Sequence, residues 1–208
     1  MTQQTPAFDA GSALSALRQS EASVRRATNP NPPILYLLWG TVYTLGYLAV
    51  HAALFGWLPM SLPLALTIFA ALTAAGAAIS AALGAHAGKG LRGESRRRGM
   101  FYGLTWASGM ICVGFIVVAL LRLYLESATV IWLSSVIATL LVGVLFATAG
   151  AAFLDRSIFF QGIALLVANV GTLLIGPGPF VLVGWLAACA VLFIGAVIAA
   201  RRTTNRLN

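Results

Sequence analysis

Apolar residues along this chain are gathered into six long stretches, and the short breaks between them are rich in polar residues, glycine and proline. A helix needs about 20 apolar residues, each rising about 1.5 Å, to cross roughly 30 Å of hydrocarbon. Each stretch is long enough or nearly so, and no break could hold a soluble domain. The pattern therefore predicts six transmembrane helices, over Ile34–Gly56, Pro63–Gly84, Met100–Leu121, Thr129–Phe153, Ile158–Ile175 and Phe180–Ala200.

The expected architecture is an all-α polytopic membrane protein, in which a short N-terminal interfacial helix precedes a six-transmembrane-helix bundle. Residues 34–200 would form the transmembrane domain, residues 1–33 a cytoplasmic N-terminal segment and residues 201–208 a basic cytoplasmic tail. Within the N-terminal segment, residues 10–28 favour a short amphipathic helix with Asp9 as its N-cap. Two interpretations stay open for this helix: a lead-in that rests on lipid headgroups, or a docking element for a cytoplasmic partner.

Composition agrees with a membrane protein. Of the 208 residues, 60% are hydrophobic and 9% are charged, whereas about a quarter of a soluble domain is charged. The formal net charge of +8 would suggest nucleic acid as a partner in a soluble protein. Here the basic residues lie in the connecting segments, which indicates membrane topology and anionic lipid headgroups, and no nucleic-acid partner.

The basic residues also predict the orientation of the chain. All but one of the 13 Lys and Arg residues precede the first span, follow the last, or lie in the breaks after the second and fourth spans. Arg122 alone lies on the opposite side. The positive-inside rule then places both termini in the cytoplasm of a multi-pass protein of the bacterial inner membrane. The residues on the basic side are Arg18, Arg25, Arg26, Lys89, Arg92, Arg96, Arg97, Arg98, Arg156, Arg201, Arg202 and Arg206.

The break at residues 88–99 is both glycine-rich and basic. It lacks the spacing of a phosphate-binding P-loop, and no strand precedes it. Basic side chains beside an anionic leaflet are attracted to it by about 1 kcal/mol each. We therefore interpret this loop as a contact for lipid headgroups, with a partner-binding loop as the alternative. The residues concerned are Lys89, Arg92, Arg96, Arg97 and Arg98.

Polar residues within a span are costly and are candidates for function by default. Trp39, Tyr43, Tyr47 and His51 recur every four residues, so they share one face of the first helix. By depth, His51, Asn169 and the pair Arg122 and Glu126 all fall in the outer half of the membrane. One outward-facing polar cavity is therefore a hypothesis, and separate interhelical hydrogen bonds are its alternative. The candidate cavity residues are Tyr43, Tyr47, His51, Asn169, Arg122 and Glu126.

If His51 lines such a cavity, it can change charge between pH 5 and 8, and we expect transport or ligand binding to depend on pH in that window. His51 falls near the outer leaflet and His86 at the inner end of the second helix, so they could not ligate one haem in one subunit. The motifs of membrane metalloproteases and intramembrane serine proteases are missing, and we expect neither enzymatic activity nor a cofactor. Cys112 and Cys189 are interpreted as packing residues.

Small residues at four-residue spacing, such as Gly76, Ser80 and Gly84, let helices approach closely in lipid. Packing within the chain is the default interpretation of these residues, and a homodimer or a partner subunit is the alternative.

The N-terminal fifth of the chain, with Ala13-Leu14, Val24-Arg25-Arg26, Asn29-Pro30, Leu35-Tyr36, Trp39-Gly40 and Leu45-Gly46-Tyr47, resembles a group of small uncharacterised bacterial multi-pass membrane proteins. These proteins are often labelled transporters. The resemblance implies a similar architecture and supplies no catalytic residues. Polar groups at matching depth without a chemistry motif favour a small-solute transporter or transport-accessory subunit. The alternative is a non-transporting membrane scaffold or regulator that acts through its N-terminal helix and basic loop.

Overall fold

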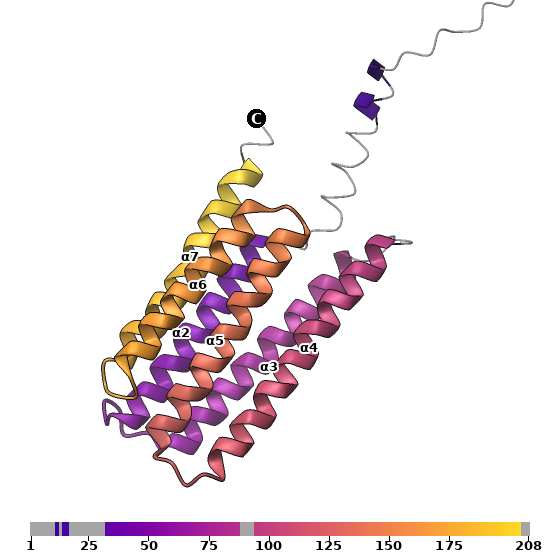
Figure 1. Cartoon of the computed structure of the whole chain (residues 1–208). Coiled ribbons are helices and arrows are strands. Elements are labelled where there is room, and N and C mark those ends of the chain that lie inside the picture. The colour runs from indigo at the N-terminus through magenta and orange to yellow at the C-terminus, as the bar shows by residue number, and fades with distance from the viewer. Residues whose placement is uncertain (1–10, 13, 17–31, 88–93, 205–208) are drawn as a thin grey trace, which may run out of the picture.

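The computed structural model describes residues 11–12, 14–16, 32–87 and 94–204. Within these residues six helices are long and apolar enough to cross a membrane, which confirms the all-α six-helix bundle predicted from the sequence. The chain is therefore an integral, multi-pass membrane protein. The helices are α2 (Pro32–Leu54), α3 (Leu62–Ala87), α4 (Glu94–Leu121), α5 (Ser127–Ala152), α6 (Arg156–Ile175) and α7 (Val181–Thr204), as Figure 1 shows.

Local chemistry explains where several helices begin and end. Pro32 is the first residue of α2, a position that tolerates proline because the missing N–H would have no partner there. The Asp155 side chain caps α6 by accepting hydrogen bonds from the backbone N–H groups of Ser157 and Ile158, at 2.9 and 3.3 Å. Gly176, with φ of 80°, ends α6, and a positive φ suits glycine because it has no Cβ.

At two ends the helices extend furthest beyond the predicted spans. The helix α4 begins at Glu94, so the second half of the predicted basic loop is helical. The helix α7 continues to Thr204 and takes in Arg201 and Arg202. The reason is that hydropathy marks the part of a helix that lies in lipid, while polar residues with good helix propensity extend it into the headgroup region.

The N-terminal helix expected over residues 10–28 falls largely outside the described residues. Those that are described, residues 11–12 and 14–16, are helical.

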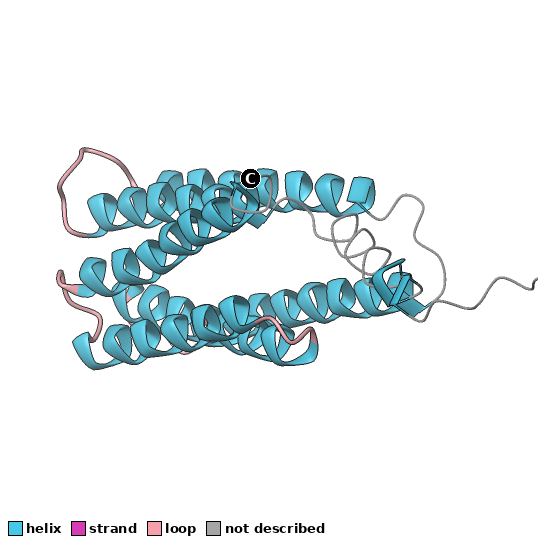
Figure 2. Ribbon diagram, turned by 90° about the horizontal axis from the view of Figure 1, so that it is seen from above, coloured by secondary structure: helices cyan, strands magenta, loops and turns pink. Residues whose placement is uncertain are grey.

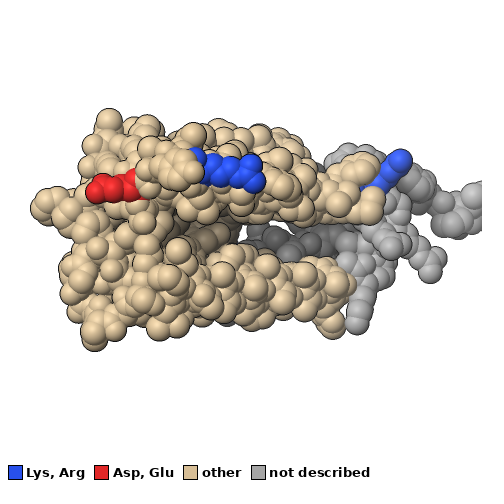
Figure 3. Space-filling model, turned by 90° about the horizontal axis from the view of Figure 1, so that it is seen from below, with Lys and Arg blue, Asp and Glu red and all other residues tan. Residues whose placement is uncertain are grey.

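Packing places the helices in a continuous series of neighbours: α3 against α2, α2 against α7, α7 against α6, α6 against α5, and α5 against α4. The helices α3 and α4 are consecutive in the chain, yet they form the two ends of this series. Seen from above, the helix ribbons lie in two rows (Figure 2), and the space-filling view has a hollow between two rows of atoms (Figure 3). From Gly99 to Leu121, all of which the structure describes, no residue is buried within the protein.

The tightest helix pair is α5 with α6, and small residues account for it. A Cβ on Gly162 of α6 would meet backbone atoms of Ala147 and Gly143 on α5. A Cβ on Gly150 would likewise meet the backbone of Phe159. For Gly143 and Ala147, packing within the chain is thus what the structure shows. In contrast, nothing lies within 4 Å of a Cβ built on Gly84 of α3.

Candidate functional site

A column of aromatic rings runs along the interior face of α2. Ring centroids are 5.3 Å apart for Trp39 and Tyr43, and 6.1 Å apart for Tyr43 and Tyr47. Trp185 of α7 then stacks on Tyr47 at 4.7 Å with an interplanar angle of 15°. The ring of His51 lies 6.4 Å from that of Trp185. The four residues predicted to share a face of the first helix do share it, and that face contacts both α3 and α7.

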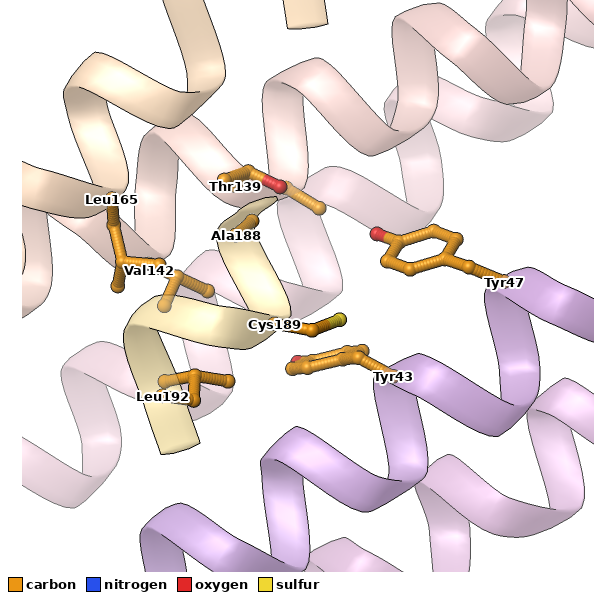
Figure 4. Close-up of a pocket in the computed structure, with 9 residues that line it drawn as sticks. Tyr43, Tyr47, Thr139, Val142, Leu165, Ala188, Cys189 and Leu192 are labelled. Atoms are coloured by element: carbon orange, nitrogen blue, oxygen red, sulfur yellow. The ribbon is translucent and has the colours of Figure 1, made fainter. Parts of the chain in front are cut away.

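Beside this column, near the middle of the bundle, lies a small cavity of about 40 Å³. Its walls come from α2, α5, α6 and α7, and we call it the central chamber. Figure 4 shows the hydroxyl of Tyr47 directed toward Thr139, with the sulfur of Cys189 beside both tyrosine rings. The lining residues are Tyr43, Tyr47, Ala138, Thr139, Val142, Leu165, Ala188, Cys189 and Leu192.

The central chamber is largely apolar, carries no charged side chain among the described residues that line it, and has a few polar groups. Among the described residues that line it, two phenols, one hydroxyl and one thiol supply the polar side-chain groups, and the rest are apolar. Its volume exceeds the roughly 10–15 Å³ that one water molecule needs. The chamber can therefore hold a small hydrogen-bonding molecule, and it has no side chain to neutralise a full charge.

His51 lies in the last turn of α2, where the column ends, and is fully buried, with 0% of its surface exposed. Its Nε2 lies 2.8 Å from the carbonyl oxygen of Pro179, in the turn between α6 and α7. The rings of Phe55 and Trp57 pack on it, each with a centroid distance of 4.5 Å. These contacts enclose the imidazole, which does not line the central chamber.

Asn169 is buried on α6 and also lies outside the chamber lining. Its Oδ1 and the Nδ1 of His51 are buried atoms without a hydrogen-bond partner in the described part of the chain. Both unpartnered atoms lie in the half of the bundle that holds the end of α2 and the end of α6. Burying a polar group without a partner is costly, so each atom marks a place where a further donor or a water would be stabilising.

Arg122 and Glu126 lie at the outer surface. Arg122 follows the last residue of α4, and Glu126 is the residue before the first of α5. They therefore do not lie on one helix, because the chain turns at residues 122–126. Both side chains are exposed, no ion pair joins these two described residues, and neither lines the central chamber.

Of the basic-loop candidates, Lys89 and Arg92 lie outside the described residues, as do the side chains of Arg96 and Arg98. Arg97 is exposed on α4, and its guanidinium carbon lies 6.0 Å from the centroid of the Phe101 ring.

Sequence reasoning missed the half of the site that α5 and α7 contribute. Trp185 donates its Nε1–H to Oγ of Ser135 at 2.8 Å, and Trp132 donates to the carbonyl oxygen of Thr172 at 2.9 Å. Thr139 and Cys189 complete the polar lining of the chamber. Each of these residues of α5 and α7 is isolated among apolar residues in the sequence, and no periodic pattern marks it.

The chain matches no protein-family model, and no curated protein or solved structure is significantly similar to it.

Proposed function

We propose that this protein is a transporter that carries a small, neutral, polar solute across the membrane by way of the central chamber. The observation that carries the proposal is the position of the chamber. Tyr43 lies 11 residues after Pro32, which is about 17 Å along a helix and close to half the membrane thickness. Polar groups that converge at this depth are characteristic of substrate pathways.

The lining supports the substrate class. The hydroxyls of Tyr43, Tyr47 and Thr139 can donate and accept hydrogen bonds, which suits a solute with hydroxyl or amide groups. The lining lacks a charged side chain among the described residues, so an ion would be left uncompensated in a medium of low dielectric constant. The volume of about 40 Å³ corresponds to an occluded conformation that widens for the solute.

The proposed orientation has both termini in the cytoplasm of a bacterial inner membrane. The excess of Lys and Arg on the termini side of the chain supports it. In Figure 1 the start of α4, the turn between α5 and α6, and the end of α7 lie at one end of the bundle. That end carries Arg97, Arg156, Arg201 and Arg202.

Uptake into liposomes tests the proposal. Purified protein would be reconstituted into liposomes. Entry of small neutral solutes such as urea and glycerol makes the liposomes swell, and light scattering would follow this swelling. Ala188→Phe places a ring in the chamber and is expected to abolish uptake. Ala187→Phe, at the neighbouring exposed position on α7, is the matched control and is expected to leave uptake unchanged.

A second variant separates a loss of transport from misfolding caused by Ala188→Phe. Tyr47→Phe removes one hydroxyl from the chamber and keeps the ring that stacks on Trp185. We expect it to slow uptake several-fold with the protein still monodisperse. If no solute enters faster than in protein-free liposomes, the transport proposal fails and the scaffold or regulator alternative takes its place.

A further inference from the structure

A second hollow lies on the outside of the bundle, between α6 and α7 at the end where the termini lie. It is an open groove of about 450 Å³, far larger than the central chamber. We call it the α6/α7 groove. Its lining residues are Arg156, Ser157, Phe160, Gln161, Ala164, Val191, Ile194, Gly195, Ile198 and Arg202.

The mouth of the α6/α7 groove is positively charged. Arg156 is the first residue of α6, and Arg202 lies in the last turn of α7. Arg202 keeps 52% of its side chain exposed, and it lies 3.7 Å from the carboxylate of Asp155. That carboxylate also caps α6, so it offsets one positive charge locally. Arg156 and Arg202 carry two positive charges against the single negative charge of Asp155, so among these described residues the mouth keeps a net positive charge.

Away from the mouth the groove becomes apolar. Phe160, Ile194 and Ile198 line it and are 65%, 59% and 41% exposed. Ile194 lies eight residues before Arg202, which is about 12 Å along the helix and into the hydrocarbon region. The groove therefore presents cations at the headgroup level and apolar side chains at the level of acyl chains.

The floor of the groove is formed by a glycine and a buried amide side chain. Gly195 provides a flat surface, and a Cβ at this position would meet the amide of Gln161 beneath it. Gln161 is 7% exposed, and its Nε2–H donates to the carbonyl oxygen of Val191 at 3.4 Å. Gly195 thus leaves room for the Gln161 amide between the two helices, and Ser157 adds a hydroxyl to the groove lining.

We propose that the α6/α7 groove binds an anionic phospholipid of the leaflet on the termini side. The phosphate contacts the guanidinium groups of Arg156 and Arg202, and one acyl chain lies along Phe160, Ile194 and Ile198. Guanidinium groups recognise phosphate oxygens well, and basic pockets between transmembrane helices hold anionic headgroups. A soluble anion would satisfy the arginines alone, whereas a lipid also covers the apolar part of the groove.

Native mass spectrometry of the full chain, released from detergent with phosphatidylglycerol or phosphatidylcholine present, tests this site. Arg156→Gln and Arg202→Gln are each expected to lower the apparent affinity for phosphatidylglycerol about fivefold, which corresponds to the attraction of one Arg near the surface. Arg201→Gln is the matched control, since Arg201 does not line the groove, and it should change the affinity less than twofold. Equal effects of Arg201→Gln and Arg202→Gln would overturn the proposal, as would equal affinities for the two lipids.

A second pair of variants separates a lipid site from a phosphate site. Ile198→Trp fills the apolar part of the groove, whereas Val197→Trp adds the same ring at a neighbouring exposed position outside it. We expect Ile198→Trp to lower phosphatidylglycerol binding and Val197→Trp to leave it unchanged. Inorganic phosphate at equal concentration should not displace the lipid. Displacement by phosphate, or equal effects of the two tryptophans, would contradict an acyl-chain site.

Discussion

The imidazole of His51 on α2 lies 2.8 Å from the carbonyl oxygen of Pro179, a residue 128 positions later in the chain. A carbonyl can only accept, so Nε2 carries the proton and donates it. The other ring nitrogen is buried without a partner among the described residues. This bond connects the C-terminal end of α2 to the turn between α6 and α7, where the aromatic column ends.

Replacing His51 tests how much this hydrogen bond contributes to stability. His51→Phe keeps a ring among Phe55, Trp57 and Trp185 but removes the donor to Pro179. We expect the free energy of unfolding to fall by about 1 kcal/mol, the net value of one such hydrogen bond. Unfolding in mixed micelles measures it. His86→Phe changes the exposed histidine of α3 and should have no effect; equal losses for the two variants would contradict a specific role for His51.

The bond between Trp185 and Ser135 is expected to couple α7 to α5. In a double-mutant cycle, Trp185→Phe and Ser135→Ala should show a coupling energy of about 0.6 kcal/mol, typical of hydrogen bonds between membrane helices. Ser134 is the neighbouring control, since its hydroxyl donates within α5 to the carbonyl oxygen of Val130. Additive effects in the Trp185/Ser135 cycle would show that the bond contributes nothing to stability.

Two glycines of α6 are expected to respond oppositely to alanine. At Gly162 a Cβ would meet backbone atoms of α5, which cannot move aside without separating the helices. Gly162→Ala should therefore destabilise the protein by roughly 1–3 kcal/mol. At Gly171 a Cβ would meet nothing within 4 Å, so Gly171→Ala should be neutral or stabilising by up to about 1 kcal/mol. Thermal unfolding in detergent compares them, and a more stable Gly162→Ala variant would refute the close α5–α6 packing.

The sequence was sufficient to predict the spans because the bilayer fixes their length and composition. The spacing of Trp39, Tyr43 and Tyr47 likewise predicted their common face, since the helix repeat is independent of tertiary structure. The opposite wall of the site could not be predicted in this way. Cys189 joins these tyrosines because α7 packs against α2, and Thr139 of α5 reaches the same chamber from across the bundle. His51 bonds to a backbone carbonyl, which no side-chain pattern reveals.

The proposed topology can be tested by labelling single cysteines introduced into a cysteine-free variant. Ser127→Cys, at the start of α5, should react with an impermeant maleimide added to intact cells. Thr204→Cys, at the end of α7, should react only after the cells are opened. Both positions are exposed, so accessibility of the side chain is not limiting. The reverse pattern would invert the proposed orientation.

The reactivity of the two native cysteines tests the transport proposal most directly. Cys189 lines the central chamber, whereas Cys112 is exposed on α4, where it faces lipid in the proposed membrane arrangement. A thiol reacts as its thiolate, which requires water. In membranes, a small neutral maleimide should alkylate Cys189 of Cys112→Ser protein faster than Cys112 of Cys189→Ser protein, because transport admits water to the chamber. Equal, negligible rates for the two thiols would mean that the chamber stays closed, and would contradict transport through it.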